Sequence, residues 1–339
     1  MQLDLEDLYL SQIVPGWSRT KRRALIAVGL LIASVYVCIA MLTDSAKLAD
    51  ALRQLGWRGC LAVLALSLLN YLLRFERWQF YLHRLGRDLT HGRHLLYYLS
   101  GFAFTVSPAK AGEAMRSLYL QDHGITYRVS FAAFFVERLL DLFAITALAS
   151  LIVFDHVKYR PMFIATVTLL AVILVGARQG VVPLMIERFS ARFSARFSAG
   201  IARLLAGFAG LLRSSSQLLR PRSLLLGFVL GLGAWAAEGV GFQFICEALH
   251  ISGSVTMFVG IYALSVLAGS IAFILPAGIG GMEIVMTALL VEQGAPLRVA
   301  IIATLLCRLA TLWFAVIIGV AAAAAVELTH RPARVGLNP

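Results

Sequence analysis

Long apolar segments alternate with short polar ones along almost the whole chain. The first, residues 24–42, has 19 residues and no charge, which is long enough to cross a bilayer as a helix. The pattern predicts an all-α polytopic membrane protein with about six full spans. The five later segments of this kind lie at residues 59–82, 129–154, 161–177, 223–249 and 299–326.

Two more apolar segments are interrupted by Pro and Gly, at roughly residues 94–120 and 254–293. In the first of them, neither limb is long enough to cross a bilayer alone. We expect both segments to form broken, re-entrant hairpins, which makes six crossings, or eight if the hairpins span. The residues expected to break the helices are Pro108, Gly112, Pro276, Gly278 and Gly280.

The second broken segment is a partial copy of the first. A shift of 170 residues, without a gap, places Glu113 on Glu283 and Arg138 on Arg308. Three full spans separate the copies, and an odd number of crossings inverts the second copy relative to the first. Inverted repeats with broken helices are a design of secondary transporters. A glycine pair and an arginine pair also coincide at this shift, Gly124 with Gly294 and Arg128 with Arg298.

These patterns predict one membrane domain, residues 24–326, between a polar start at 1–23 and a short basic tail at 327–339. We expect repeat one at about 24–154 and repeat two at about 161–326. The whole membrane domain is therefore two related halves of one folding unit.

Residues 178–222 differ from the rest of the membrane domain because arginines recur in them. The unit Arg-Phe-Ser-Ala occurs three times in succession, beginning at Arg188. Positions four apart share a helix face, so the arginines would form one stripe and the phenylalanines the next. We predict a cytoplasmic, basic amphipathic segment. It either lies in the membrane interface against anionic headgroups or is a duplicated linker without a specific role.

The loops on the two sides of the membrane differ in charge. With the amino terminus inside, cytoplasmic segments carry 18 of the 30 Lys and Arg residues, and external segments carry six. The positive-inside rule then predicts cytoplasmic amino and carboxyl termini. Arginine is preferred to lysine, which is typical of GC-rich bacterial coding and indicates a bacterial inner (plasma) membrane.

Composition supports this class and narrows the partners. Sixty per cent of the 339 residues are hydrophobic and 14% are charged, which is more apolar than a soluble core requires. The net charge of +12 does not indicate nucleic acid, because the arginines lie between apolar segments; we expect membrane lipids as partners, anionic phospholipid above all. The four cysteines have no paired spacing, so we expect no disulfide framework, no metal site and no cofactor.

The charges embedded in apolar segments are the candidate site. Arg138 and Arg308 each lie nine residues inside a span, roughly 14 Å deep at ~1.5 Å per residue. An isolated charge there costs at least ~2.5–3.5 kcal/mol, so each side chain must meet a partner or a wet cavity. The charges either form ion pairs that hold the hairpins, or line a midplane chamber for a phospholipid headgroup. The candidate substrate-binding residues are Lys110, Glu113, Arg116, Glu137, Arg138, Asp141, Glu283 and Arg308.

Other polar and aromatic side chains receive simpler interpretations. Glu238 is a weaker candidate, because one carboxylate in the middle of a helix can pair within the bundle. Arg74 and Arg77 are expected to extend to the cytoplasmic interface. Four aromatic residues are expected as interfacial anchors, namely Trp57, Trp78, Tyr97 and Tyr98.

Three motifs carry a family resemblance. The first is a proline followed by Gly-Glu and an arginine, at Pro108, Gly112, Glu113 and Arg116. The second is Glu-Arg-x-x-Asp, at Glu137, Arg138 and Asp141. The third is Pro-x-Gly-x-Gly-x-x-Glu, at Pro276, Gly278, Gly280 and Glu283, with a later arginine at Arg308. Over most of residues 55–326 the chain resembles the transmembrane, flippase-type domain of lysylphosphatidylglycerol synthases.

The resemblance implies lipid translocation and does not imply lipid synthesis. The sequence departs from the family pattern at Lys110, where arginine is more usual; the charge is kept, but the bidentate geometry is not. The soluble aminoacyl-transferase domain of full synthases does not follow residue 326, so we expect a stand-alone member that is not an enzyme. The alternatives are an accessory subunit for a separate lipid-modifying synthase or glycosyltransferase, and a membrane enzyme of lipid or lipid-linked glycan synthesis.

Overall fold

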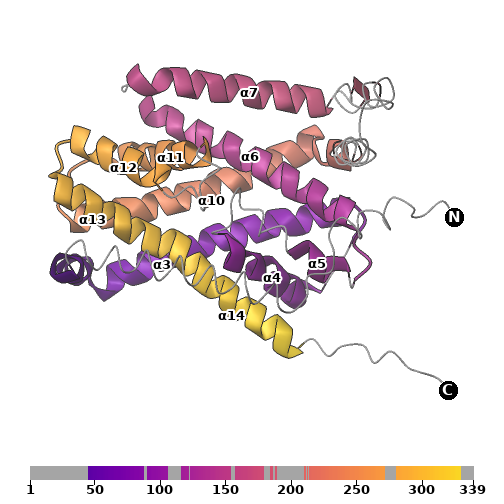
Figure 1. Ribbon diagram of the computed structural model, residues 1–339, viewed down its shortest axis with the longest axis horizontal. Helices are drawn as coiled ribbons and strands as arrows, with labels where there is room; N and C mark the ends of the chain where they lie inside the picture. Colours follow the sequence, from indigo (N-terminus) through magenta and orange to yellow (C-terminus); the bar gives the residue numbers. More distant parts are fainter. Residues whose placement is uncertain are drawn as a thin grey trace, which may run out of the picture.

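A computed structural model describes most of the membrane domain (Figure 1). Every regular element in the described residues is helical, which confirms the all-α prediction for them. The described residues are 45–87, 90–105, 116–121, 123–153, 157–178, 184–185, 188, 210, 212, 214–271 and 280–329. The main helices are α3 (Ser45–Arg84), α4 (His91–Ser100), α5 (Arg116–Gln121), α6 (Tyr127–Val153), α7 (Arg160–Arg178), α10 (Pro221–Ala248), α11 (Val255–Ile271), α12 (Gly281–Glu292), α13 (Leu297–Arg308) and α14 (Phe314–Thr329).

Four of the predicted spans coincide with helices that are long and apolar enough to cross a membrane. Within the described part of the chain these stretches are Leu48–Arg84, Val157–Gly176, Pro221–Ala248 and Leu297–Leu328. The remaining described span is α6, whose 27 residues extend roughly 40 Å and include four charged residues. The first predicted span, residues 24–42, lies outside the described residues, so the number of crossings stays a prediction.

The two predicted breaks are only partly described. Pro108, Gly112, Pro276 and Gly278 lie outside the described residues. Gly280 is described, and its φ of 96° is a conformation that other residues rarely adopt. Helix α12 starts immediately after it, and the broken hairpin itself stays a prediction.

The sequence repeat has a counterpart in the backbone. The turns from α5 to α6 and from α12 to α13 each contain a glycine with positive φ, Gly124 at 72° and Gly294 at 89°. The Gly124 amide donates to the Gln121 carbonyl at 2.9 Å, and the Gly294 amide donates to the Val291 carbonyl at the same distance. Helices α6 and α13 then begin 170 residues apart. The same helix-turn-helix unit therefore occurs twice.

The two copies run in opposite directions. In Figure 1, α6 runs from the right end of the molecule, near α5, to the left end, where α7 begins. Helices α13 and α14 run from left to right in the same view. Helices α4 and α5 lie toward the right of this view, and α11 and α12 lie toward the left. This is the arrangement that an inverted repeat requires.

Helix α3 connects the two halves. The Asn70 side-chain amide donates to the Ala234 carbonyl of α10 at 2.9 Å. Helices α13 and α14 are joined by a π-helical turn, Leu309–Trp313, and two of its carbonyls accept hydrogen bonds from α3. The donors are the Ser67 hydroxyl, 2.9 Å from the Ala310 oxygen, and the Tyr71 hydroxyl, 2.8 Å from the Thr311 oxygen.

Candidate functional site

Six charged side chains meet inside repeat one, and we call them the arginine cluster. Two come from α3, one from the start of α5, and three from one turn of α6. Five are almost fully buried, and the side chain of Arg138 is 20% exposed. The cluster consists of Arg74, Arg77, Arg116, Glu137, Arg138 and Asp141.

Glu137 lies at the centre of this cluster with no exposed surface. Its Oε2 accepts a hydrogen bond from Arg116 Nη2 at 2.5 Å, and its Oε1 accepts one from the Tyr98 hydroxyl at 2.7 Å. Arg138 Nη2 lies 3.1 Å from Oε1, and Arg77 Nη2 lies 3.7 Å from the same oxygen. Both carboxylate oxygens are therefore satisfied by protein donors, which offsets the cost of burying the charge.

Asp141 lies one turn further along α6 and joins that helix to α3 and α10. Its Oδ1 accepts hydrogen bonds from Arg77 Nη2 at 2.5 Å and from the indole N–H of Trp235 at 3.1 Å. Its Oδ2 lies 3.0 Å from Arg138 Nη2. The close approach of α10 depends on Gly231, because a Cβ there would lie 2.7 Å from Arg77 Nη1. Three helices thus meet at one carboxylate.

Arg116 has a different environment, dominated by aromatic rings. Its guanidinium carbon lies 3.6 Å from the ring centre of Trp78 and 4.7 Å from that of Tyr98. The ring centre of Phe134 lies 5.5 Å away. Its Nε and Nη1 are buried and have no hydrogen-bond partner among the residues that the structure describes. Cation–π contacts and the ion pair with Glu137 therefore hold the group, and two of its nitrogen atoms donate to none of the described residues.

Arg308, the counterpart of Arg138 in repeat two, forms an ion pair with Glu283. Arg308 Nε donates to Glu283 Oε1 at 2.7 Å, and Arg308 Nη1 lies 3.2 Å from the Met282 sulfur. The second oxygen of Glu283 accepts the Gly280 amide at 2.8 Å and so caps the start of α12. The pairing of Glu283 with Arg308 is one of the two arrangements that the sequence left open.

A small cavity lies between the arginine cluster of repeat one and the Glu283–Arg308 ion pair of repeat two. Its volume is about 70 Å³, and residues of both repeats line it, including Arg74, Glu238 and Arg308. Glu238 is nearly buried and accepts a hydrogen bond from the Tyr262 hydroxyl. Glu238, a weaker candidate from the sequence, therefore lies between the arginine cluster and the ion pair of repeat two.

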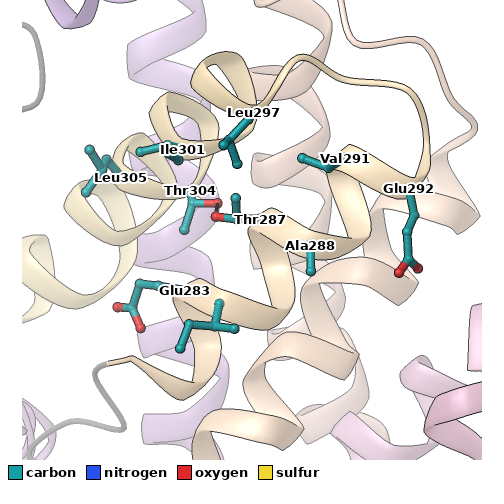
Figure 2. Close-up of a pocket in the computed structure, with 10 residues that line it drawn as sticks. Glu283, Thr287, Ala288, Val291, Glu292, Leu297, Ile301, Thr304 and Leu305 are labelled. Carbon is teal, nitrogen blue, oxygen red and sulfur yellow. Dashed lines mark hydrogen bonds between the residues drawn. The ribbon is translucent and has the colours of Figure 1, made fainter.

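A much larger groove of about 610 Å³ lies between α12 and α13, and Figure 2 shows it. Glu283 lies at one end of the groove, and Glu292 and Leu297 lie at the other. Halfway along, the hydroxyls of Thr287 and Thr304 are 3.2 Å apart. The other lining residues are apolar, namely Ile284, Ala288, Val291, Ile301 and Leu305.

Two predictions about single residues were wrong. Arg74 and Arg77 do not extend to the interface; they are 5% and 0% exposed, because Glu137 and Asp141 neutralise them inside the bundle. The spacing of the charges in the sequence could have indicated this pairing. Arg74 and Arg77 lie on one face of their helix, and Glu137 and Asp141 lie on one face of theirs, so two positive charges can meet two negative charges.

The aromatic anchors were also predicted incorrectly in three of four cases. Trp78, Tyr97 and Tyr98 are buried. The Trp78 indole N–H donates to His94 Nε2 at 2.8 Å, and Tyr98 bonds to the arginine cluster, so both rings have polar partners inside the protein. Trp57 is 72% exposed.

The structure brings together most of the predicted site residues that it describes. Arg116, Glu137, Arg138 and Asp141 form one group with the two arginines of α3. Glu283 and Arg308 form the second group. Lys110 and Glu113 lie outside the described residues, as do most residues of the segment 178–222, including two of its three Arg-Phe-Ser-Ala units. Among the described residues, no group of three His, Cys, Asp or Glu side chains could hold a metal ion.

Comparison with known proteins gives one family. The family model described as the lysylphosphatidylglycerol synthase TM region matches residues 26–319, which is most of the chain. No curated protein matches the chain. The family match confirms the resemblance that the three motifs indicated.

Proposed function

We propose that this chain, which belongs to the family of lysylphosphatidylglycerol synthase transmembrane regions, moves a lipid between the two leaflets of its membrane. The family and the apolar helices make it a multi-pass membrane protein linked to lipid metabolism or translocation. The cargo in this proposal is a phospholipid, or another lipid with a polar headgroup, that passes the embedded charges. No chemical conversion of the lipid is part of the proposal.

The observation that carries this proposal is the surplus of guanidinium groups in the arginine cluster. Four arginines face two carboxylates among the described residues, in the interior of a membrane protein. Guanidinium binds phosphate and carboxylate through paired hydrogen bonds. An anionic lipid group at Arg116 would accept bonds from its Nε and Nη1 and would reduce the positive surplus.

The cavity next to the cluster supports a route across the midplane. It is lined from repeat one by Arg74 and from repeat two by Arg308, with Glu238 between them. A headgroup handed from one repeat to the other would keep an arginine beside it, which lowers the cost of holding charge inside the bilayer. The loop charges favour cytoplasmic termini, and the preference for arginine over lysine favours a bacterial inner membrane for this transporter.

The test is lipid movement by the purified protein in vesicles. Phosphatidylglycerol with a fluorophore on one acyl chain is quenched by an impermeant reductant, and the quenched fraction counts lipids that reach the outer leaflet. We expect movement with the wild type, a loss of at least tenfold with Arg116→Gln, and no change with Arg53→Gln, an exposed arginine of α3. Because Arg116→Gln takes one buried partner from Glu137 and should lower the melting temperature, lipid movement is compared at equal amounts of folded, reconstituted protein.

Other results would contradict the proposal. Conversion of the added lipid, detected by mass spectrometry of the extract, would indicate an enzyme. Neither movement nor conversion by the wild type would favour an accessory subunit for a separate synthase or glycosyltransferase. Normal movement by Arg116→Gln would show that the cluster is a structural ion-pair network.

A further inference from the structure

We propose that the groove between α12 and α13 holds one acyl chain of a membrane phospholipid from the leaflet beside the α12–α13 turn. This inference deepens the proposed function, on which it rests, by naming the place and the leaflet at which a lipid enters. The headgroup of that lipid lies at the mouth of the groove, at the end marked by Glu292 and Leu297 (Figure 2).

The chemistry of the lining fits a hydrocarbon chain. The lining is apolar apart from the two glutamates at its ends and the two threonines, whose hydroxyls lie within hydrogen-bond distance of each other. Three of the apolar residues are well exposed, Ile284 by 70%, Leu297 by 60% and Val291 by 40%. On a membrane protein, such a surface faces lipid tails, and the volume of about 610 Å³ is in the range of pockets that enclose a small ligand.

The length of the groove fits one leaflet. Glu283 and Glu292 are nine residues apart on α12, which is about 13–14 Å at ~1.5 Å per residue. Half of a hydrocarbon core ~30 Å thick is ~15 Å. A chain that enters at the mouth therefore ends near the Glu283–Arg308 pair, beside the small cavity that Arg308 also lines.

The mouth has the charges that a phospholipid headgroup needs. Lys158, which precedes α7 and is about half exposed, forms an ion pair with Glu292. Arg298, next to Leu297 in the first turn of α13, is exposed. Cations at the membrane surface attract lipid phosphate. The groove thus has cations at its mouth and an apolar floor, in the order in which a phospholipid presents its headgroup and tail.

The internal repeat shows why the groove is found here. The shift of 170 residues gives each α13 lining residue a counterpart on α6, and every counterpart is aromatic. Phe134 in particular lies against the Arg116 guanidinium. The aliphatic and threonine side chains of repeat two are smaller than these aromatic rings and therefore leave space where repeat one is filled. The counterparts of Leu297, Ile301, Thr304 and Leu305 are Tyr127, Phe131, Phe134 and Phe135.

The test fills the groove without touching the charged residues. Ala288→Trp places a ring in the groove, and Ala165→Trp places the same ring on an exposed position of α7, outside it. Phosphatidylglycerol with a photoreactive diazirine on one acyl chain is reconstituted with each protein, irradiated, and mapped by peptide mass spectrometry. We expect labelling concentrated in residues 284–305, reduced at least fivefold by Ala288→Trp and unchanged by Ala165→Trp.

Lipid movement is measured on the same vesicles, and Ala288→Trp should slow it at least fivefold. If Ala288→Trp does not fold, Ile301→Phe, which copies the residue of repeat one, replaces it. Uniform labelling of all lipid-facing helices, or labelling that the filled groove retains, would overturn the acyl-chain site even if the wild type moves lipid. Groove labelling by a wild type that moves no lipid would leave the site standing and contradict the proposed function. Reduced labelling with normal movement would overturn its role as the entry point.

Discussion

The two repeats have the same helix-turn-helix backbone but differ in the positions of their buried charges and of the open space between helices. Both contain a short helix, a turn at a positive-φ glycine and a long helix with an arginine at the same position. Repeat one surrounds its arginine with five other charged groups and with aromatic rings. In the described part of repeat two, the arginine pairs with Glu283, and a groove lies open between α12 and α13.

This difference shows which features the repeat retains. The turn geometry is the same in both repeats, because it sets the angle between the helices. At equivalent buried positions, however, one repeat has a charged side chain where the other has a neutral one. Three charged residues of α5 and α6 differ in repeat two: Arg116, Glu137 and Asp141 correspond to Met286, Cys307 and Thr311. The charge surplus and the open groove are therefore placed in different repeats.

The largest expected effect tests whether the two repeats are inverted across the membrane. His123 and Gln293 are equivalent at the shift of 170, and both are exposed in the turns. With the native cysteines replaced, His123→Cys should be labelled by an impermeant maleimide only from the cytoplasmic side, and Gln293→Cys only from outside. The measurement is labelling of intact and opened cells. Labelling of both from one side would break the comparison, because the repeats would then be parallel.

The second effect compares the carboxylates of the two repeats. Glu137→Gln leaves four arginines with one carboxylate and should lower the free energy of unfolding by ~3–5 kcal/mol, since a buried pair loses one partner. Glu283→Gln should cost about 1.5–3 kcal/mol, because the amide oxygen can still accept the Gly280 amide. Melting temperatures in detergent measure both, with Glu76→Gln, an exposed residue of α3, as the control.

The same variants separate stability from transport. Glu283→Gln and its counterpart Glu113→Gln should each strongly slow lipid movement while the folded protein stays in the membrane. Equal losses of stability in Glu137→Gln and Glu283→Gln would contradict the unequal burial of the two sites. Normal lipid movement in both Glu283→Gln and Glu113→Gln would remove these glutamates from the transport route.

The smallest expected effect tests whether the two glycine turns, which both repeats share, are equivalent. At both Gly124 and Gly294 an added Cβ meets nothing within 4 Å, so the cost of alanine is backbone strain alone. Each change to Ala should cost about 1–2 kcal/mol, and the two costs should be equal. Gly92→Ala, in a helix and equally open, should be neutral or slightly stabilising. Unequal melting temperatures for the two turn variants would show that the turns are not equivalent.

The sequence predicted the elements and the grouping of charges along one helix, but not the partners between helices. Glu137, Arg138 and Asp141 lie within one turn of α6, so their proximity follows from helical spacing. Arg77 and Asp141 are 64 residues apart, and their contact depends on how α3 packs against α6. That packing is tertiary, and apolar periodicity does not specify it.

The groove was not predicted, and neither were the position and lining of the small cavity, for a related reason. Both depend on the volumes of side chains that face each other across helices. The residues that line the groove have the sequence pattern of an ordinary apolar helix. Their smaller side chains indicate open space only when they are compared with the aromatic residues at the equivalent positions of the other repeat. Glu238 faces the cavity because of how α10 packs against α3, which the sequence of α10 does not reveal.

The π-helical turn after Arg308 has a mechanical consequence. It contains one residue more than an α-helical turn, and hydrogen bonds from Ser67 and Tyr71 hold two of its carbonyls. If those bonds broke and the turn closed to α-helical spacing, α14 would rotate by about 100° about its axis and slide by ~1.5 Å relative to Arg308. Since Ser67 and Tyr71 belong to the helix that also carries Arg74 and Arg77, α3 links the arginine cluster to the rotational position of α14.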